Sequence, residues 1–379
     1  MAERPRAYLL DALRGLAALS VVLFHWKQFL WVGTTPGHVD YHALPGSTLL
    51  WFFYTRGGQA VDLFFVLSGF VFYWLYSQAI AQRRVGAREF AILRFSRLYP
   101  LHFATLIIVA VGQAVYIART GSPFVYGITD AKHFLLQLGF ASYWGLQDGF
   151  SFNGPVWSVS IEIALYAIFF LTARFFSRGM WAAAFMALIG MVMMLVYPPI
   201  ARGLCGFFVG GCTYLVYSRM NPRWASAVWT AALLAWIATF VFAYRPGATP
   251  VAMKIVWPTF VLFPVTVLSV ALLEQRWPRI GRPFAWLGDI SYSTYMLHFP
   301  TELMVMIAAT FVAFKVPVYS GWALIAWFAV LILLGRASYK FFEIPAQRAI
   351  RGRFLSRQPR VAAAEEGSVS VAAAERPAP

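Results

Sequence analysis

The segment Tyr8–Leu30, with the sequence YLLDALRGLAALSVVLFHWKQFL, decides the fold class. It is apolar along most of its length, and a helix needs about 20 such residues to cross the roughly 30 Å hydrocarbon core of a bilayer. Three ionisable side chains interrupt it, namely Asp11, Arg14 and His25. Asp11 and Arg14 are three residues apart, a spacing that allows an ion pair on one helix face. The segment therefore predicts a first transmembrane helix that carries polar groups into the membrane.

The composition of the whole chain agrees with a membrane protein. Of its 379 residues, 60% are hydrophobic and only 12% are charged, whereas soluble domains contain about 25% charged residues. The formal net charge of +16 taken alone would also suit a nucleic-acid binder. Basic cytoplasmic loops of a membrane protein account for this charge without nucleic acid. We therefore expect membrane lipids, and no nucleic acid, around this chain.

Ten apolar stretches are candidate membrane crossings. They cover residues 8–30, 60–80, 99–118, 156–176, 180–197, 203–218, 224–243, 253–273, 285–310 and 320–341. A shorter apolar segment, 133–144, is left uncounted as re-entrant or interfacial. With the N-terminus in the cytoplasm, most of the 31 basic residues fall on the cytoplasmic side, as the positive-inside rule requires. These patterns predict an all-α, polytopic transmembrane helical bundle with about ten crossings, both termini cytoplasmic, in the plasma (inner) membrane.

The chain divides into two parts by composition. Residues 1–345 hold all the candidate crossings and form one predicted transmembrane domain. Residues 346–379 are first basic and then rich in Ala, Glu, Ser, Val and Pro, a composition that cannot build a core. We expect a disordered cytoplasmic tail there. Because no soluble catalytic domain is expected at either end, any chemistry belongs to the membrane part.

Arg14 and His25 are the strongest functional candidates in the first helix. They are eleven residues apart, which is close to three full helical turns, so both lie on one face about 16 Å apart along the axis. A buried histidine often only forms a structural hydrogen bond. A neutral imidazole in a dry cavity is also a competent general base near neutral pH. An arginine nearer the cytoplasm can hold the phosphates of an anionic cofactor through bidentate contacts.

Further ionisable or polar residues recur in other predicted helices, where each is a functional candidate by default. Arg94 and Arg97, expected in the inner loop after the crossing 60–80, are three apart and suit phosphate binding. Topology or contact with anionic lipid also explains basic residues in such a loop. Glu162 lies two turns inside a helix that begins on the outer face, where it could meet His25. The other cavity candidates are Ser68, Asp62, Asp11, Tyr295 and His298; for Tyr295 and His298 a structural hydrogen-bond role is the alternative.

Five motifs in order along the chain resemble acyltransferase family 3, a family of integral membrane proteins. The motifs are Arg14 followed eleven residues later by His25, FFVLSGF at 64–70, RFSRLYP at 94–100, WSVSIE at 157–162 and SYSTYMLH at 291–298. The resemblance implies transfer of an acyl group, usually acetyl from acetyl-CoA on the cytoplasmic side, to a hydroxyl on the far side. It implies His25 as the catalytic base, with Arg14, Arg94 and Arg97 as donor contacts and no metal.

The hypothesis that follows is a membrane O-acyltransferase that moves acetyl from acetyl-CoA to an extracytoplasmic or lipid-linked carbohydrate. In this hypothesis His25, Arg14 and Glu162 are catalytic, and Arg14, Arg94, Arg97 and Ser68 bind the donor. Some members of the family that the chain resembles carry a fused extracytoplasmic esterase-like domain. None is expected here, which points to the stand-alone members, whose acylation targets include exopolysaccharides, lipo-oligosaccharides and macrolides. The alternative is a lipid-linked sugar flippase, because intramembrane Arg, His and Glu also suit a proton relay. Inverted repeats and matching broken helices, typical of transporters, are not visible in the sequence.

Overall fold

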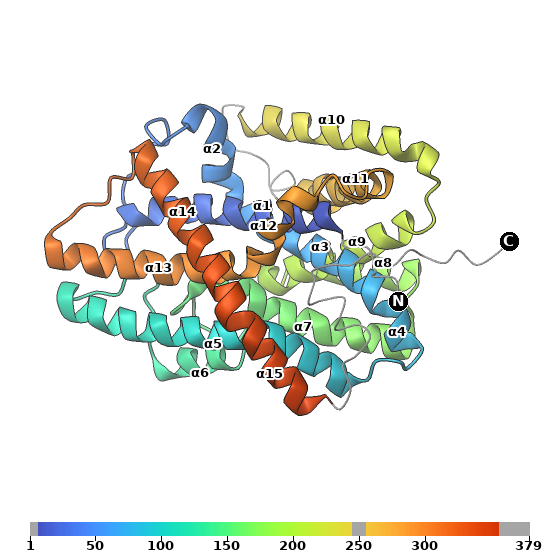
Figure 1. The fold of residues 1–379 in the computed structure, drawn as a ribbon, viewed down its shortest axis with the longest axis horizontal. Coiled ribbons are helices and arrows are strands. Elements are labelled where there is room, and N and C mark those ends of the chain that lie inside the picture. The colour runs from blue at the N-terminus through green and yellow to red at the C-terminus, as the bar shows by residue number, and fades with distance from the viewer. Residues whose placement is uncertain (1–6, 245–254, 356–379) are drawn as a thin grey trace.

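The computed structural model describes residues 7–244 and 255–355. Within these ranges the chain forms helices and turns, with two isolated β-bridges in place of strands. Figure 1 shows the long helices packed into one bundle, with α1 in its interior and α10 along one edge. The long helices are α1 Tyr8–His25, α3 Ala60–Leu75, α5 Ala87–Thr120, α7 Trp157–Leu171, α8 Met180–Met193, α9 Pro198–Tyr217, α10 Ala225–Ala243, α11 Phe263–Arg276, α13 Ser291–Val312 and α14 Gly321–Ser338.

Nine helical segments of the described ranges are long and apolar enough to cross a membrane. The predicted crossing at 180–197 is the exception, because α8 contains 14 residues and rises about 21 Å. The chain nevertheless turns back through α8, because α7 and α9 begin at the same end of the bundle. There the guanidinium of Arg202, in α9, lies 5.2 Å from the ring centroid of Trp157, the first residue of α7. The nine long segments and α8 together agree with the predicted all-α bundle of about ten crossings.

Several boundaries differ from the sequence predictions. The crossing predicted to start at residue 60 is preceded by α2, Ser47–Arg56, and the 3₁₀ turn Gly57–Gln59, so much of the outer loop expected before it is helical. The uncounted segment 133–144 contains α6, Ala131–Leu138, whose eight residues are too few to span a bilayer. The short helices α4, Ser77–Ala81, and α12, Ala285–Asp289, link longer ones.

The end of the described chain continues beyond the predicted domain boundary at residue 345. A π-helical turn, Tyr339–Glu343, joins α14 to α15, Ile344–Phe354. Figure 1 shows α14 and α15 as one long rod crossing the bundle, and Arg351 of α15 donates from Nε to the Ser96 hydroxyl of α5 at 3.1 Å. The structure does not describe residues 356–379, the rest of the predicted tail. It also does not describe residues 253 and 254, the first two of the predicted crossing 253–273. The orientation of the termini stays a prediction.

Glycine residues allow α3 and α9 to pack backbone against backbone. A Cβ atom placed on Gly69 would lie 1.7 Å from the carbonyl oxygen of Phe207, and one on Gly210 would lie 2.0 Å from that of Val66. Small residues of this kind are typical of close helix pairs in membranes, where hydrophobicity does not hold helices together. The interface fixes α3, and with it the face of α3 that carries Ser68.

Gly69→Ala is expected to destabilise the bundle, because even one methyl group requires the two backbones to separate. Overpacking of this kind costs about 1–3 kcal/mol, so the detergent-solubilised protein should unfold at a lower temperature than the wild type. Gly352→Ala is the matched control, because a Cβ atom at residue 352 has no neighbour within 4 Å. Equal thermal stability of the two variants would contradict this account of the α3–α9 contact.

Candidate active site

A cavity of about 150 Å³ lies inside the bundle, between α1, α3, α5, α7 and α13. Seven of the residues singled out in the sequence line it: Asp11, Arg14, Ser68, Arg94, Arg97, Glu162 and Tyr295. These residues are scattered over the chain from position 11 to position 295. The fold therefore brings most of the predicted candidates to a single internal space.

Arg14 is fixed at one end of the cavity by contacts with its own helix and with the start of α13. Its Nη2 lies 3.4 Å from Oδ1 of Asp11, which confirms the predicted ion pair. The same guanidinium donates from Nε to the Ser291 hydroxyl at 3.0 Å and from Nη2 to the Gly288 carbonyl at 2.9 Å. These contacts orient the Arg14 side chain against the start of α13.

Arg94 and Arg97 lie within the long helix α5 instead of the inner loop expected from the sequence, and they differ in environment. Arg94 is buried and donates from Nη2 to the Tyr76 hydroxyl at 2.8 Å. Its guanidinium also lies 5.0 Å from the ring centroid of Phe72 and 5.8 Å from that of Tyr166. Arg97 is partly exposed, lines the cavity, and forms no hydrogen bond or ion pair with any residue of the described ranges.

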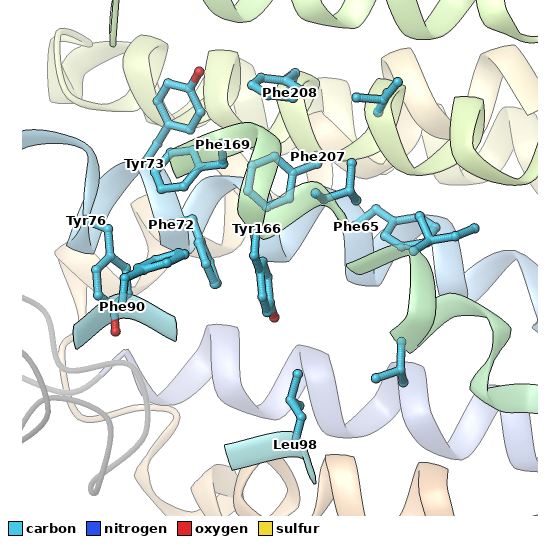
Figure 2. Packing of buried hydrophobic residues seen from close by; sticks show 14 of the residues in the cluster. Phe65, Phe72, Tyr73, Tyr76, Phe90, Leu98, Tyr166, Phe169, Phe207 and Phe208 are labelled. Carbon is cyan, nitrogen blue, oxygen red and sulfur yellow. The ribbon is translucent and has the colours of Figure 1, made fainter. Parts of the chain in front are cut away.

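An aromatic layer supports this end of the cavity. Phe72 stacks on Tyr166 with 4.4 Å between ring centroids and packs edge-on to Phe207 at 5.7 Å. Figure 2 shows Phe72 and Tyr166 with Phe207 on one side of them and Leu98 on the other. All three rings are buried, and the Arg94 guanidinium lies against two of them, Phe72 and Tyr166.

Glu162 forms its hydrogen bonds inside the cavity. Its Oε1 accepts from the Ser68 hydroxyl at 2.8 Å and from the Tyr166 hydroxyl at 2.5 Å. Glu162 therefore has two hydrogen-bond partners, Ser68 and Tyr166. The structure gives no contact between Glu162 and His25, so the suggested meeting of these two residues is not seen.

His25 lies beyond the cavity, beside a second histidine. Its Nδ1 is 2.9 Å from the Val21 carbonyl oxygen, and since a carbonyl only accepts, Nδ1 carries the proton of the neutral ring. The other nitrogen, Nε2, then has the free lone pair that a general base requires. The ring centroid of His25 lies 4.9 Å from that of His298 on α13, so the structure pairs two predicted candidates.

Tyr295 links the cavity to the two histidines. It lines the cavity, and its ring centroid lies 5.7 Å from that of His298. Its hydroxyl donates to the Pro155 carbonyl at 2.6 Å and lies 2.7 Å from the Ser158 hydroxyl. Tyr295 thus stands at the point where the cavity ends and the histidine pair begins.

Asp62 has a structural contact away from the cavity. Arg202 of α9 binds it in a bidentate manner, with Nε to Oδ1 at 3.0 Å and Nη2 to Oδ2 at 2.9 Å. Neither residue lines the cavity. Asp62 therefore differs from the other cavity candidates, because its carboxylate is bound by Arg202 of α9.

Sequence reasoning missed two buried polar residues near the histidine pair. Glu302 follows His298 by one helical turn on α13, and both are only 1% exposed. An ionisable residue inside a predicted crossing was the available signal. Asn153 is also 1% exposed and donates from Nδ2 to the Met296 carbonyl at 3.3 Å. That carbonyl has no helical donor because residue 300, four positions later, is a proline without an N–H.

Comparison with known proteins identifies the family. Residues 8–336 match the acyltransferase domain of acyltransferase family 3. The chain belongs to this family. No solved structure matches the chain. Together with the nine long apolar helices, the match shows a multi-pass integral membrane O-acyltransferase.

Three relatives from bacteria illustrate the range of the family. The exopolysaccharide production protein ExoZ of Rhizobium meliloti (strain 1021) is 28% identical over 79% of this chain and 92% of its own length. BcsY of Komagataeibacter xylinus, named provisionally as a membrane-bound transacylase, is 26% identical over 77% of this chain and 72% of its own. The acyltransferase MdmB of Streptomyces mycarofaciens is 31% identical over 45% of this chain and 41% of its own.

Proposed function

We propose that this acyltransferase moves an acetyl group from acetyl-CoA, bound at the Arg97 end of the cavity, to a carbohydrate hydroxyl bound at the His25 end. The observation that carries the proposal is the cavity itself, which begins among arginines and ends at Tyr295 beside two histidines. The proposal assigns the Arg97 end to the cytoplasm and the membrane to the plasma (inner) membrane. The carbohydrate acceptor is suggested by the name of the relative ExoZ, an exopolysaccharide production protein.

The arginine end fits the anionic part of the donor. Arg97 has no hydrogen bond or ion pair within the described chain and lines the cavity, so its planar guanidinium is available for phosphate oxygens. Arg94 is held by Tyr76 and contributes positive charge from a buried position. Arg14 lines the same cavity and adds a further positive charge. The apolar residues of the cavity lining, such as Phe64, Leu67 and Val71, suit the pantetheine arm.

The histidine end fits proton transfer from a hydroxyl. In the proposed reaction His25 Nε2 accepts the acceptor hydroxyl proton while that oxygen bonds to the thioester carbonyl carbon. The carbon–sulfur bond breaks, and the thiolate of CoA recovers the proton from His25, so atoms and charges balance. General base catalysis supplies about 10²–10⁴-fold. Glu162, held by Ser68 and Tyr166, is proposed to keep the cavity polar where the thioester passes.

The test uses the protein purified into lipid nanodiscs, with radiolabelled acetyl-CoA and bacterial polysaccharide fragments as acceptors. The proposal expects label on the carbohydrate, removed by mild alkali as an ester, and a mass increase of one acetyl group. Labelled acceptor must be absent when acetyl-CoA is replaced by free acetate. Movement of a lipid-linked sugar across the membrane without donor dependence, and without acetylation, would contradict the proposal and favour the flippase.

A further inference from the structure

Three buried side chains on α13, or bonded to it, have polar atoms without a hydrogen-bond partner in the described ranges. They are His298 and Glu302 on α13 and Asn153, which precedes the 3₁₀ turn Gly154–Val156. Each side chain is 1% exposed, and the atoms without partners are His298 Nε2, Glu302 Oε1 and Asn153 Oδ1. Buried polar atoms in native proteins are nearly always hydrogen-bonded, so each such exception calls for an explanation.

The unpartnered atoms of His298 and Asn153 are hydrogen-bond acceptors. His298 Nδ1 contacts the Tyr295 carbonyl, which fixes the proton on Nδ1 and leaves a lone pair on Nε2. Asn153 donates from Nδ2 to the Met296 carbonyl, which fixes the amide orientation and leaves Oδ1 free. Glu302 also presents a bare carboxyl oxygen, Oε1. A ligand that satisfies all three atoms, on His298, Asn153 and Glu302, must therefore bring several hydrogen-bond donors.

The three residues belong to one region with His25. His298 and Glu302 are four residues apart and share a face of α13, and the ring of His298 is the one paired with His25. Asn153 is hydrogen-bonded to the carbonyl of Met296, which lies two residues before His298 on α13. Tyr126 closes the region: its hydroxyl accepts from Gln28 Nε2 at 3.3 Å, and its ring centroid lies 4.6 Å from that of Phe299. Burial, with a smaller contribution from the Glu302 carboxyl, raises the pKa of Tyr126.

We infer that His298, Glu302 and Asn153 form the acceptor subsite and accept hydrogen bonds from hydroxyls that neighbour the reacting one. The inference rests on the proposed function, because His25 is taken as the base for the reacting hydroxyl. It specifies the proposed carbohydrate acceptor further: the reacting hydroxyl has neighbouring hydroxyls, as on a sugar ring, and an alcohol with a single hydroxyl is a poor acceptor. A lone hydroxyl would satisfy His25 and leave the three buried acceptors without donors, which is unfavourable.

The variants Glu302→Leu, Glu302→Gln and Asn153→Leu test the subsite, with KM measured separately for acceptor and for acetyl-CoA. Glu302→Leu and Asn153→Leu should each raise the acceptor KM about tenfold or more, since a hydrogen bond to the ligand is lost. The KM for acetyl-CoA should change less than about twofold. Glu302→Gln keeps an oxygen that can accept a hydrogen bond, so it should restore most of the affinity for the carbohydrate. Thr301→Val, a half-buried position on the next face of α13, is the matched control and should leave both constants unchanged.

A deoxy acceptor, which lacks the hydroxyl next to the acetylated one, distinguishes a ligand contact from a structural effect. With this acceptor the wild type should lose as much affinity as Glu302→Leu or Asn153→Leu loses with the full acceptor. For at least one of the two leucine variants, replacing the full acceptor by the deoxy acceptor should raise the acceptor KM little further. An acceptor KM that is unchanged in both leucine variants would overturn the subsite, as would equal efficiency with a mono-alcohol.

Failure of the subsite and failure of the proposed reaction give different results. Binding of the polysaccharide fragment is measured by thermal stabilisation of the protein without acetyl-CoA. A wild type that is stabilised by the glycan, while the leucine variants are not, supports the subsite even if no acetyl group is transferred. Transfer by the wild type with full glycan stabilisation of the leucine variants supports the reaction and overturns the subsite. A wild type that neither binds nor acetylates any glycan overturns both.

Discussion

His25→Asn is expected to lower kcat for acetyl transfer by about 10²–10⁴-fold, the usual contribution of a general base. The reason is that Nε2 is the nitrogen with a free lone pair, because Nδ1 is committed to the Val21 carbonyl. Asparagine keeps a polar group of similar reach but has no base at that position. The KM for acetyl-CoA should change little, since His25 does not line the cavity. The measurement is steady-state transfer of labelled acetyl to the acceptor in nanodiscs.

His38→Asn is the control for the loss of a histidine, because His38 is exposed in the segment after the first helix. It should keep wild-type kcat. Near-normal turnover of a correctly inserted His25→Asn protein would remove the base assignment from His25.

Arg97→Ala is expected to raise the KM for acetyl-CoA by about 10–150-fold with kcat largely retained. This range follows from a hydrogen bond to a charged group, worth about 1.5–3 kcal/mol, at about 1.4 kcal/mol per factor of ten. Arg97→Lys should recover only part of the affinity, because a lysine cannot make the bidentate contact to phosphate. The loss should shrink at high salt, since Arg97 is partly exposed and its field is screened.

Arg88→Ala is the matched control for Arg97→Ala, since Arg88 lies exposed in the first turn of the same helix. It should leave the KM for acetyl-CoA unchanged. Arg94→Ala should behave differently from both, because it removes a buried cation that contacts Tyr76 and Phe72, and thermal stability should fall together with donor affinity. An Arg97→Ala protein with wild-type donor KM would contradict the donor site.

The fold class was predictable because a bilayer imposes a simple length rule on each crossing. Long apolar stretches such as 8–30 appear in the structure as helices. The boundaries were less predictable: α5 runs from Ala87 to Thr120, although its first turns are basic and do not look like a crossing. The crossing predicted at 180–197 corresponds to the shorter α8, Met180–Met193, so the apolar pattern did not mark where this helix ends.

The candidate site was predictable where periodicity within one helix decides it. Arg14 and His25 share a face of one helix, and Asp11 pairs with Arg14 at the predicted spacing. Contacts between residues of different helices could not be predicted, because a single sequence does not show which helices lie side by side. The partnership of Glu162 with Ser68 depends on how α3 meets α7, and the pairing of Asp62 with Arg202 depends on how α3 meets α9. The burial of Glu302 likewise depends on how α13 packs against its neighbours.

The central claim is that an acetyl group passes through the bundle from the Arg97 end to the His25 end. The most direct test is a proteoliposome in which all molecules have one orientation, with labelled acetyl-CoA outside and a polysaccharide acceptor trapped inside. The account predicts acetylated acceptor only when acetyl-CoA is added on the Arg97 side and the acceptor is on the opposite side. Transfer that requires donor and acceptor on the same side would contradict it.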